Sequence, residues 1–279
     1  MQFKSRETKK IISICLVSVI ISLFAFGATG VGASEYKTPI EINRDQENGT
    51  IHVRTSIADY LFTNQGGQLR SIFIHFSSFR TNKAEIVPGT TTDPETMNRS
   101  YLDGVKFPGE LQLRGSSDED VQYQVDIPEG THYDEIPITF IGETDGLEIE
   151  KTFTIHNDPN YTLGISLSIT NQSGEEIKLG EEDKLYLGSR TKASGDGNVD
   201  YLTDTTTKYI FDGEVSNGKL AQGSYSSFGG VGLVGKNLVL FLKSGLPYAD
   251  EESPADSGVV PYVSQGDLGV NLTGTELAN

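Results

Sequence analysis

The sequence predicts an all-β protein, with a large two-sheet antiparallel sandwich preceded by one N-terminal transmembrane helix. Apolar and polar residues alternate with period two through most of residues 51–243, as in strands with one buried face. After residue 33, no segment keeps a 3.6-residue apolar period for ten residues or more. The chain also has 31 Gly and no Trp, and glycine is common in the turns that connect strands. These observations favour two packed antiparallel sheets.

The predicted helix is residues 11–33, a segment without a single charged side chain. As a helix it would be roughly 35 Å long, which is enough to cross a hydrocarbon core of about 30 Å. Basic residues precede it and acidic residues follow it, so the positive-inside rule places residues 1–10 in the cytoplasm and the rest of the chain outside. Val31-Gly32-Ala33 resembles a signal-peptide cleavage site. The sequence therefore leaves both a retained signal anchor and a cleaved signal peptide open.

The remainder of the chain is interpreted as a linker and one domain. Residues 34–50 are polar without an apolar period, which predicts a linker. Residues 51–279 then form one extracytoplasmic β-sandwich domain. Its clearest element is a hairpin with strands at 147–155 and 161–169 and a turn of five residues between them. Lys151 falls on the apolar face of this hairpin, so it must lie near a sheet edge or be paired.

Shorter runs with the same alternation predict further strands, and a Gly66-Gly67 turn connects the second and third of them. These strands are Ile51–Thr55, Asp59–Thr63, Leu69–Phe76, Glu110–Arg114, Val121–Ile127, Ile136–Ile141, Lys184–Leu187, Tyr209–Asp212 and Asn237–Lys243.

The charge balance excludes one class of partner. The chain has a formal net charge of −17, and after residue 33 it carries 18 basic and 38 acidic side chains, a net charge of −20. Nucleic-acid binding needs a basic surface, so the sequence predicts no nucleic-acid partner. The same charge disfavours peripheral binding to anionic lipid. The single cysteine, Cys15, excludes an internal disulfide.

No pattern of catalytic or metal-binding residues stands out. The four histidines have no metal-ligand spacing and are interpreted as surface or hairpin residues: His52, His75, His132 and His156. Residues 196–200 resemble the start of a calcium loop, but Tyr201 and Thr207 replace its required Gly and Glu. The acidic run Asp118-Glu119-Asp120 is predicted to be a solvated loop. We therefore expect no catalytic residue, no cofactor and no metal, and a protein that is not an enzyme.

Three segments share features with a known family. Residues 51–76 hold two strands, the Gly66-Gly67 turn and a Leu-x-Ser-Ile sequence. Residues 146–179 hold a strand that begins with Lys-x-Phe-x-Ile, a short turn with Tyr161, an alternating strand and Asn171. Residues 228–244 hold a glycine-containing turn before a strand with Phe241. In this order, after an N-terminal anchor and a polar linker, they resemble the extracytoplasmic domain of the YidC family of membrane protein insertases.

The resemblance implies a mutarotase-like super-sandwich fold and a retained anchor. It places the chain in the cell (inner) membrane as a single-pass protein, with its bulk periplasmic. In this family the insertase activity resides in a transmembrane helix bundle downstream of the sandwich, so the domain is expected to be truncated at its C-terminal end. The implied role is that of a scaffold or chaperone-like partner-binding domain in membrane protein insertion and folding. Its partners would be translocation components and nascent membrane proteins.

Two alternatives belong to other functional classes. The first is a free-standing exported β-sandwich that binds carbohydrate, although such sites usually stack sugars on exposed aromatic side chains and this chain has no Trp. The second is a mutarotase-type enzyme, which would need paired histidines and a carboxylate over one sheet. The four histidines show no such pattern along the sequence.

Overall fold

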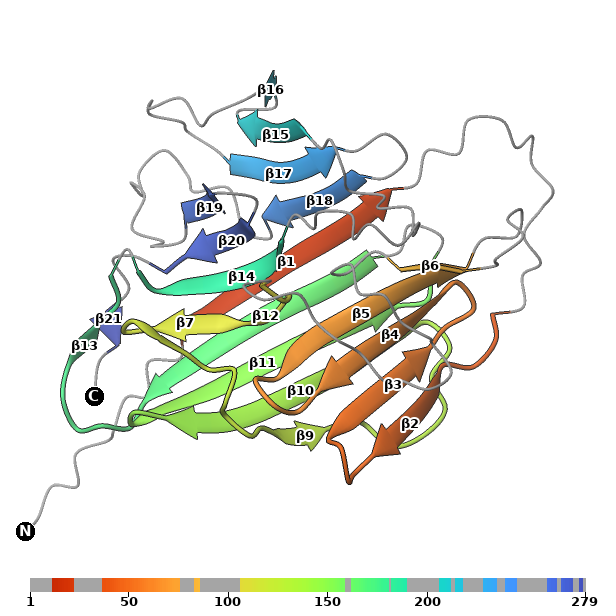
Figure 1. Cartoon of the computed structure of the whole chain (residues 1–279), viewed down its shortest axis with the longest axis horizontal. Helices are drawn as coiled ribbons and strands as arrows, with labels where there is room; N and C mark the ends of the chain where they lie inside the picture. Colours follow the sequence, from red (N-terminus) through yellow and green to blue (C-terminus); the bar gives the residue numbers. More distant parts are fainter. Residues whose placement is uncertain are drawn as a thin grey trace, which may run out of the picture.

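The computed structural model of the chain describes about three fifths of its residues (Figure 1). The described ranges are 12–22, 37–75, 83–85, 106–158, 162–180, 182–189, 206–211, 214–217, 228–234, 239–244, 260–264, 267–272 and 276–277. Every regular element among them is a β-strand. In these ranges, no helix has the length and apolarity needed to cross a membrane. The predicted all-β class with antiparallel sheets is confirmed.

The largest sheet has nine strands in the order β16-β15-β17-β18-β1-β12-β11-β10-β9, and each neighbouring pair is antiparallel. Its strands are β1 (Ile12–Ser22), β9 (Gln124–Asp126), β10 (Glu135–Thr144), β11 (Leu147–His156), β12 (Thr162–Asn171), β15 (Thr206–Phe211), β16 (Glu214–Asn217), β17 (Phe228–Val234) and β18 (Val239–Ser244).

Three smaller sheets complete the described fold. One five-stranded sheet has the order β2-β3-β4-β5-β6, with β2 (Glu41–Asp45), β3 (Thr50–Arg54), β4 (Ala58–Thr63), β5 (Gln68–His75) and β6 (Lys83–Glu85). Another has the order β19-β20-β14-β7-β8, with β7 (Leu111–Leu113), β8 (Ser116–Ser117), β14 (Lys184–Ser189), β19 (Val260–Ser264) and β20 (Asp267–Asn271). Strands β13 (Ile177–Lys178) and β21 (Glu276–Leu277) form the third.

The predicted hairpin is confirmed. Strands β11 and β12 pair antiparallel from Leu147 opposite Asn171 to Ile155 opposite Leu163. The apolar residues that alternate along β11 are buried, and Lys151 is buried among them. Each of the other predicted strands overlaps an observed one: β3, β4, β5, β7, β9, β10, β14, β15 and β18.

One hydrophobic core joins the β2–β6 sheet to the β9–β12 part of the large sheet. Three aromatic rings lie at its centre: Phe62 of β4, Phe140 of β10 and Phe153 of β11. The Phe62 ring centroid is 5.1 Å from that of Phe153 and 6.0 Å from that of Phe140. Phe140 and Phe153 meet edge to face at 5.7 Å. Such pairs stabilise a core beyond their burial by about 0.5–1.5 kcal/mol each, so these rings hold the two sheets together.

The N-terminal segment differs from its prediction. Where the sequence predicts a helix, Ile12–Ser22 forms β1, which lies between β12 and β18 (red in Figure 1). A continuous apolar run has no periodicity, so its sequence alone does not distinguish a buried strand from a buried helix. Pairing with two neighbouring strands satisfies the backbone of this segment as a helix would. Residues 11 and 23–33 of the predicted helix lie outside the described residues.

Part of the predicted linker is also a strand. Glu41–Asp45 forms β2 and pairs with β3 from Glu41 opposite Arg54 to Asp45 opposite Thr50. Four of its five residues are exposed, because β2 is the last strand at one side of its sheet. An exposed edge strand buries little and is often charged, so it carries no apolar alternation by which the sequence could reveal it.

Candidate functional site

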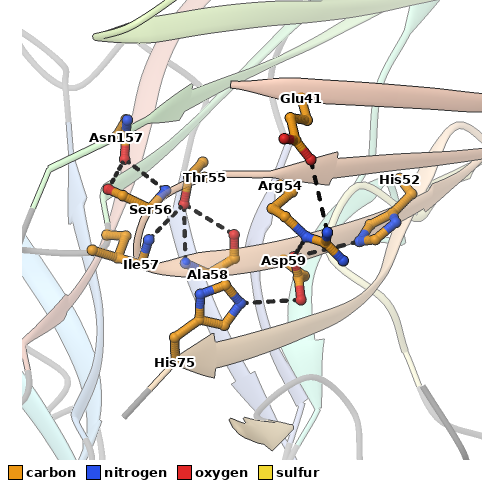
Figure 2. A network of polar contacts seen from close by, with 10 residues as sticks. All are labelled: Glu41, His52, Arg54, Thr55, Ser56, Ile57, Ala58, Asp59, His75 and Asn157. Carbon is orange, nitrogen blue, oxygen red and sulfur yellow. Dashed lines mark hydrogen bonds and ion pairs between the residues drawn. The ribbon is translucent and has the colours of Figure 1, made fainter. Parts of the chain in front are cut away.

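A carboxylate flanked by two histidines lies on the β3–β5 strands, and it is our candidate site (Figure 2). Asp59 is directly opposite Arg54 in the β3–β4 ladder, and Val53 is opposite Tyr60. Val53 and Tyr60 belong to the core. Because side chains alternate along a strand, Asp59 and Arg54 project from the other face of the sheet. Asp59 is nevertheless only 3% exposed.

Three side chains surround the Asp59 carboxylate. Arg54 donates from Nε to Oδ1 over 2.9 Å. The Nε2 atom of His75 lies 3.0 Å from Oδ2, and the Nε2 atom of His52 lies 3.5 Å from Oδ1. Glu41, on the neighbouring strand β2, lies 3.7 Å from the Arg54 guanidinium. Figure 2 shows His52 and His75 approaching the carboxylate from different sides.

This arrangement fixes both imidazoles while leaving them partly accessible. The side chains of His52 and His75 are 29% and 25% exposed, whereas that of Asp59 is 4% exposed. A buried carboxylate beside an imidazole fixes the orientation of the ring, which is how aspartates position histidines in acid–base sites. The cluster therefore presents two oriented, partly accessible imidazoles to a ligand, which is the geometry that acid–base chemistry needs. Within the described ranges, no three His, Cys, Asp or Glu side chains are placed to hold a metal ion.

The turn between β3 and β4 sets the spacing of this cluster. Thr55 Oγ1 accepts hydrogen bonds from the backbone amides of Ala58 and Ile57, at 3.0 and 3.2 Å. Asn157 Oδ1 accepts from both the amide and the hydroxyl of Ser56, at 3.2 and 2.5 Å. Asn157 follows β11 directly, so the turn that precedes β4, the strand of Asp59, is attached to the central hairpin. These contacts are drawn in Figure 2.

Sequence reasoning missed this site because it treated the histidines one at a time. In the ladders, His52 is opposite Leu61, and Phe73 is opposite Asp59. His52 and His75 are thus the diagonal neighbours of Asp59 on its two flanking strands, a spacing at which long side chains meet. The registers of the β3–β4 and β4–β5 hairpins together were the signal that could have revealed the pair.

The other two histidines lie apart from this cluster. His156 Nδ1 is 3.1 Å from Glu135 Oε2. The His132 Nε2 atom is 3.3 Å from the carbonyl oxygen of Pro128. The calcium-like segment at 196–200 lies outside the described residues.

A second polar cluster is enclosed in the core around Lys151. The Lys151 side chain is fully buried, and its ammonium donates to the carbonyl oxygens of Gly66 and Gly109, each at 2.6 Å. It also donates to the Asp118 carboxylate. An ammonium has three protons, so these three bonds use all of them. The sequence allowed Lys151 to lie near a sheet edge or to be paired, and the structure shows that it is paired with Asp118.

Asp118 corrects the prediction of a solvated acidic loop. Glu119 and Asp120 are exposed as expected, but Asp118 is only 4% exposed. Besides Lys151, it accepts from the Tyr123 hydroxyl at 2.6 Å and from the Leu111 amide at 2.9 Å. A buried carboxylate is stable when such donors surround it. These donors come from other segments, which adjacency in the sequence does not reveal.

Burial also shifts the acidities in this second cluster. Desolvation lowers the pKa of Lys151 below its usual range, and the Asp118 charge opposes that effect only in part. Desolvation raises the pKa of Tyr123, and both the Asp118 charge and the hydrogen bond to Asp118 add to the rise. Because Lys151 has no exposed surface, this cluster holds the fold together, whereas the Asp59 cluster has groups that a ligand can reach.

No family model, curated protein or solved structure matches this chain.

Proposed function

We propose that this chain is the extracytoplasmic domain of a YidC-type insertase, a mutarotase-like β-sandwich that serves as a scaffold and partner-binding surface in membrane protein insertion. The observation that carries the proposal is a contact between two of the segments that resemble the family. Lys151, from residues 146–179, donates to the carbonyl oxygen of Gly66, from residues 51–76. Two features that the resemblance rests on are therefore parts of one interaction.

The backbone geometry of the Gly66-Gly67 turn explains why these glycines occur together with Lys151. Gly66 and Gly67 have φ angles of +72° and +53°, a region that favours glycine. A Cβ atom on Gly67 would also lie 3.1 Å from Cβ of Phe140. The two glycines let the turn press against the core, where the Gly66 carbonyl can accept from Lys151. A Gly-Gly turn and a lysine on the central hairpin thus support one packing arrangement.

The charge pattern is consistent with the proposed location. Residues 1–10 are basic, residues 11–33 are uncharged, and the body is strongly acidic. This order favours export of the body with the N-terminus inside. We propose a single-pass protein of the inner membrane that contacts translocation components and nascent membrane proteins through its surface or sheet edges.

The test is to place the full chain, with a C-terminal tag, in bacterial inner membranes beside stalled nascent chains of a single-spanning membrane protein. We expect alkaline carbonate to leave the chain in the membrane and external protease to remove the tag from spheroplasts. A photo-crosslinker in the nascent chain should label the tagged protein, and a stalled cytoplasmic protein should not. Release by carbonate, or equal labelling by the two nascent chains, would refute the proposal.

The Asp59 cluster favours a second candidate, the mutarotase-type enzyme. That function needs paired histidines and a carboxylate over one sheet, and His52, His75 and Asp59 are such a set. In this role the imidazoles would exchange protons with a sugar hydroxyl and ring oxygen, while Asp59 keeps them oriented. Polarimetry of fresh α-D-glucose would test it. Acceleration by the wild type but not by a His52→Asn/His75→Asn variant would favour this candidate, and no acceleration would reject it.

A further inference from the structure

The turn between β2 and β3 contains a reactive pair of residues that the candidate site does not use. Residues 46–49 form this turn, and the ladder beside it ends at Asp45 opposite Thr50. Asn48 is exposed, and Gly49 follows it directly. In such an Asn-Gly pair, the glycine nitrogen can attack the side-chain carbonyl carbon of the asparagine, because no Cβ atom hinders the approach. The turn therefore holds the two groups from which a cyclic imide forms.

The structure requires glycine at position 49. Its φ angle is +64°, a region that favours glycine over every residue with a side chain. A Cβ atom there would also collide with the side chain of Asn64, which would have to move. In addition, the Gly49 carbonyl accepts from the Asn64 amide at 2.8 Å. A bulkier residue that would slow the cyclisation is thus disfavoured by the fold itself.

The Asn48 side chain also holds the turn closed. Its Nδ2 atom donates to Oδ2 of Asp45 at 2.7 Å. The backbone amides of Glu47 and Asn48 donate to Oδ1 of the same carboxylate at 3.0 and 3.2 Å. The bond from the Asn48 side chain is the main cause that lowers the pKa of Asp45, so this carboxylate is ionised at neutral pH. A carboxylate in place of the Asn48 amide could not donate to Asp45 and would repel it.

Strand β2 has few other contacts to keep it in place. It is the last strand of its sheet, where β3 is its neighbour, and four of its five residues are exposed. Elements that bury so little open at a low cost in free energy. Isoaspartate at position 48 would also lengthen the main chain by a methylene group and disturb the β2–β3 register. That change would move Glu41 away from Arg54, to which it is paired beside Asp59.

We propose that Asn48 is a self-modification site, and that its conversion to aspartate or isoaspartate releases β2 from β3. The Gly49 nitrogen loses its proton to water and bonds to Cγ of Asn48. The bond from Cγ to Nδ2 breaks, and this nitrogen takes up protons from water and leaves as ammonia. Water then opens the imide, at Cγ to give aspartate or at the main-chain carbonyl to give isoaspartate. Water is the only co-reactant, and nothing is oxidised or reduced.

The test is to age the full chain in buffer at neutral and at mildly alkaline pH and to map its peptides by mass spectrometry. Enzymatic carboxyl methylation measures isoaspartate in each peptide. The internal reference is Asn171, which is partly exposed and hydrogen-bonded within its own turn but is followed by Gln172. We expect Asn48 to convert at least about tenfold faster than Asn171, because glycine does not hinder the attack. The rate should rise with pH, since the attacking nitrogen must lose its proton.

Hydrogen exchange then measures the release of β2. In the aged wild type, amides of β2 should exchange at least about tenfold faster than in the fresh chain, while those of β11 stay unchanged. The matched variant is Asn48→Gln, which keeps an amide but must close a larger and less favourable ring, so its aged and fresh forms should be alike. If Asn48 keeps its amide as long as Asn171 does, or if the converted chain protects β2 as well as the fresh chain, the proposal is refuted.

Discussion

Replacing Lys151 by Met should be among the most destabilising single changes in the described core. The substitution keeps the apolar stem but leaves three acceptors without their donor: the Asp118 carboxylate and the carbonyls of Gly66 and Gly109. Breaking a buried ion pair on one side costs about 3–5 kcal/mol. An unsatisfied buried carbonyl adds about 1–3 kcal/mol where water cannot reach it. We expect a loss of at least about 3–5 kcal/mol, a large part of the 5–15 kcal/mol typical of a folded domain.

Urea unfolding of the full chain at pH 7, followed by circular dichroism and tyrosine fluorescence, measures this loss. The matched control is Lys37→Met, which makes the same change in an exposed pair with Asp134. Exposed pairs contribute about 0–1 kcal/mol. A Lys151→Met loss no larger than that of Lys37→Met would refute the reasoning.

A double-mutant cycle then tests whether charge is the cause. Asp118→Asn removes the negative charge, while its remaining oxygen can still accept from the Leu111 amide and its amide nitrogen can donate to the Tyr123 oxygen. In the wild type it should cost about 3–5 kcal/mol, because it leaves the buried Lys151 ammonium without its counter-charge. In the Lys151→Met background it should cost little or restore stability, because the isolated carboxylate is then gone. Equal costs in both backgrounds would show that the two side chains are not coupled.

Three further changes have defined outcomes in the same unfolding assay. Tyr123→Phe should cost about 1.5–3 kcal/mol at pH 7, the contribution of a hydrogen bond to a charged group. Folding raises the pKa of Tyr123 above 10.0, so the unfolded chain loses the hydroxyl proton at a lower pH than the folded chain. The free energy of unfolding of the wild type should therefore fall as pH rises above 10, and it should fall less steeply in the Tyr123→Phe variant. Gln68→Met should raise the free energy of unfolding by about 1–3 kcal/mol, because Gln68 is fully buried and neither amide atom has a partner among the described residues; a decrease would contradict this. Asp59→Asn should cost about 1–3 kcal/mol and measurably less in an Arg54→Met/His75→Asn background; an unchanged cost would mean that the cluster does not act as a unit.

The sequence predicted the central hairpin closely because its evidence is local. Along β11, every second residue is apolar, and that period alone identifies a strand with one buried face. The turn after β4 was equally clear, since adjacent glycines permit the φ angles that it uses. The prediction was wrong for Asp118 because a short acidic run does not show that one of its carboxylates is buried. That burial depends on Lys151, which is distant in the sequence and donates to Asp118.

The sequence by itself thus determined the all-β class, the strands with one buried face, the acidic body and the uncharged N-terminal segment, all of which depend on neighbours in the chain. Only the tertiary structure decided that Lys151 meets Gly66 and Asp118, which are 85 and 33 residues away, and that His52 and His75 share Asp59. It also decided that Ile12–Ser22 pairs as a strand with β12 and β18. The physical reason is that strand register and sheet order are set by long-range backbone pairing, and an apolar segment fits equally into a sheet or a bilayer until its surroundings are known.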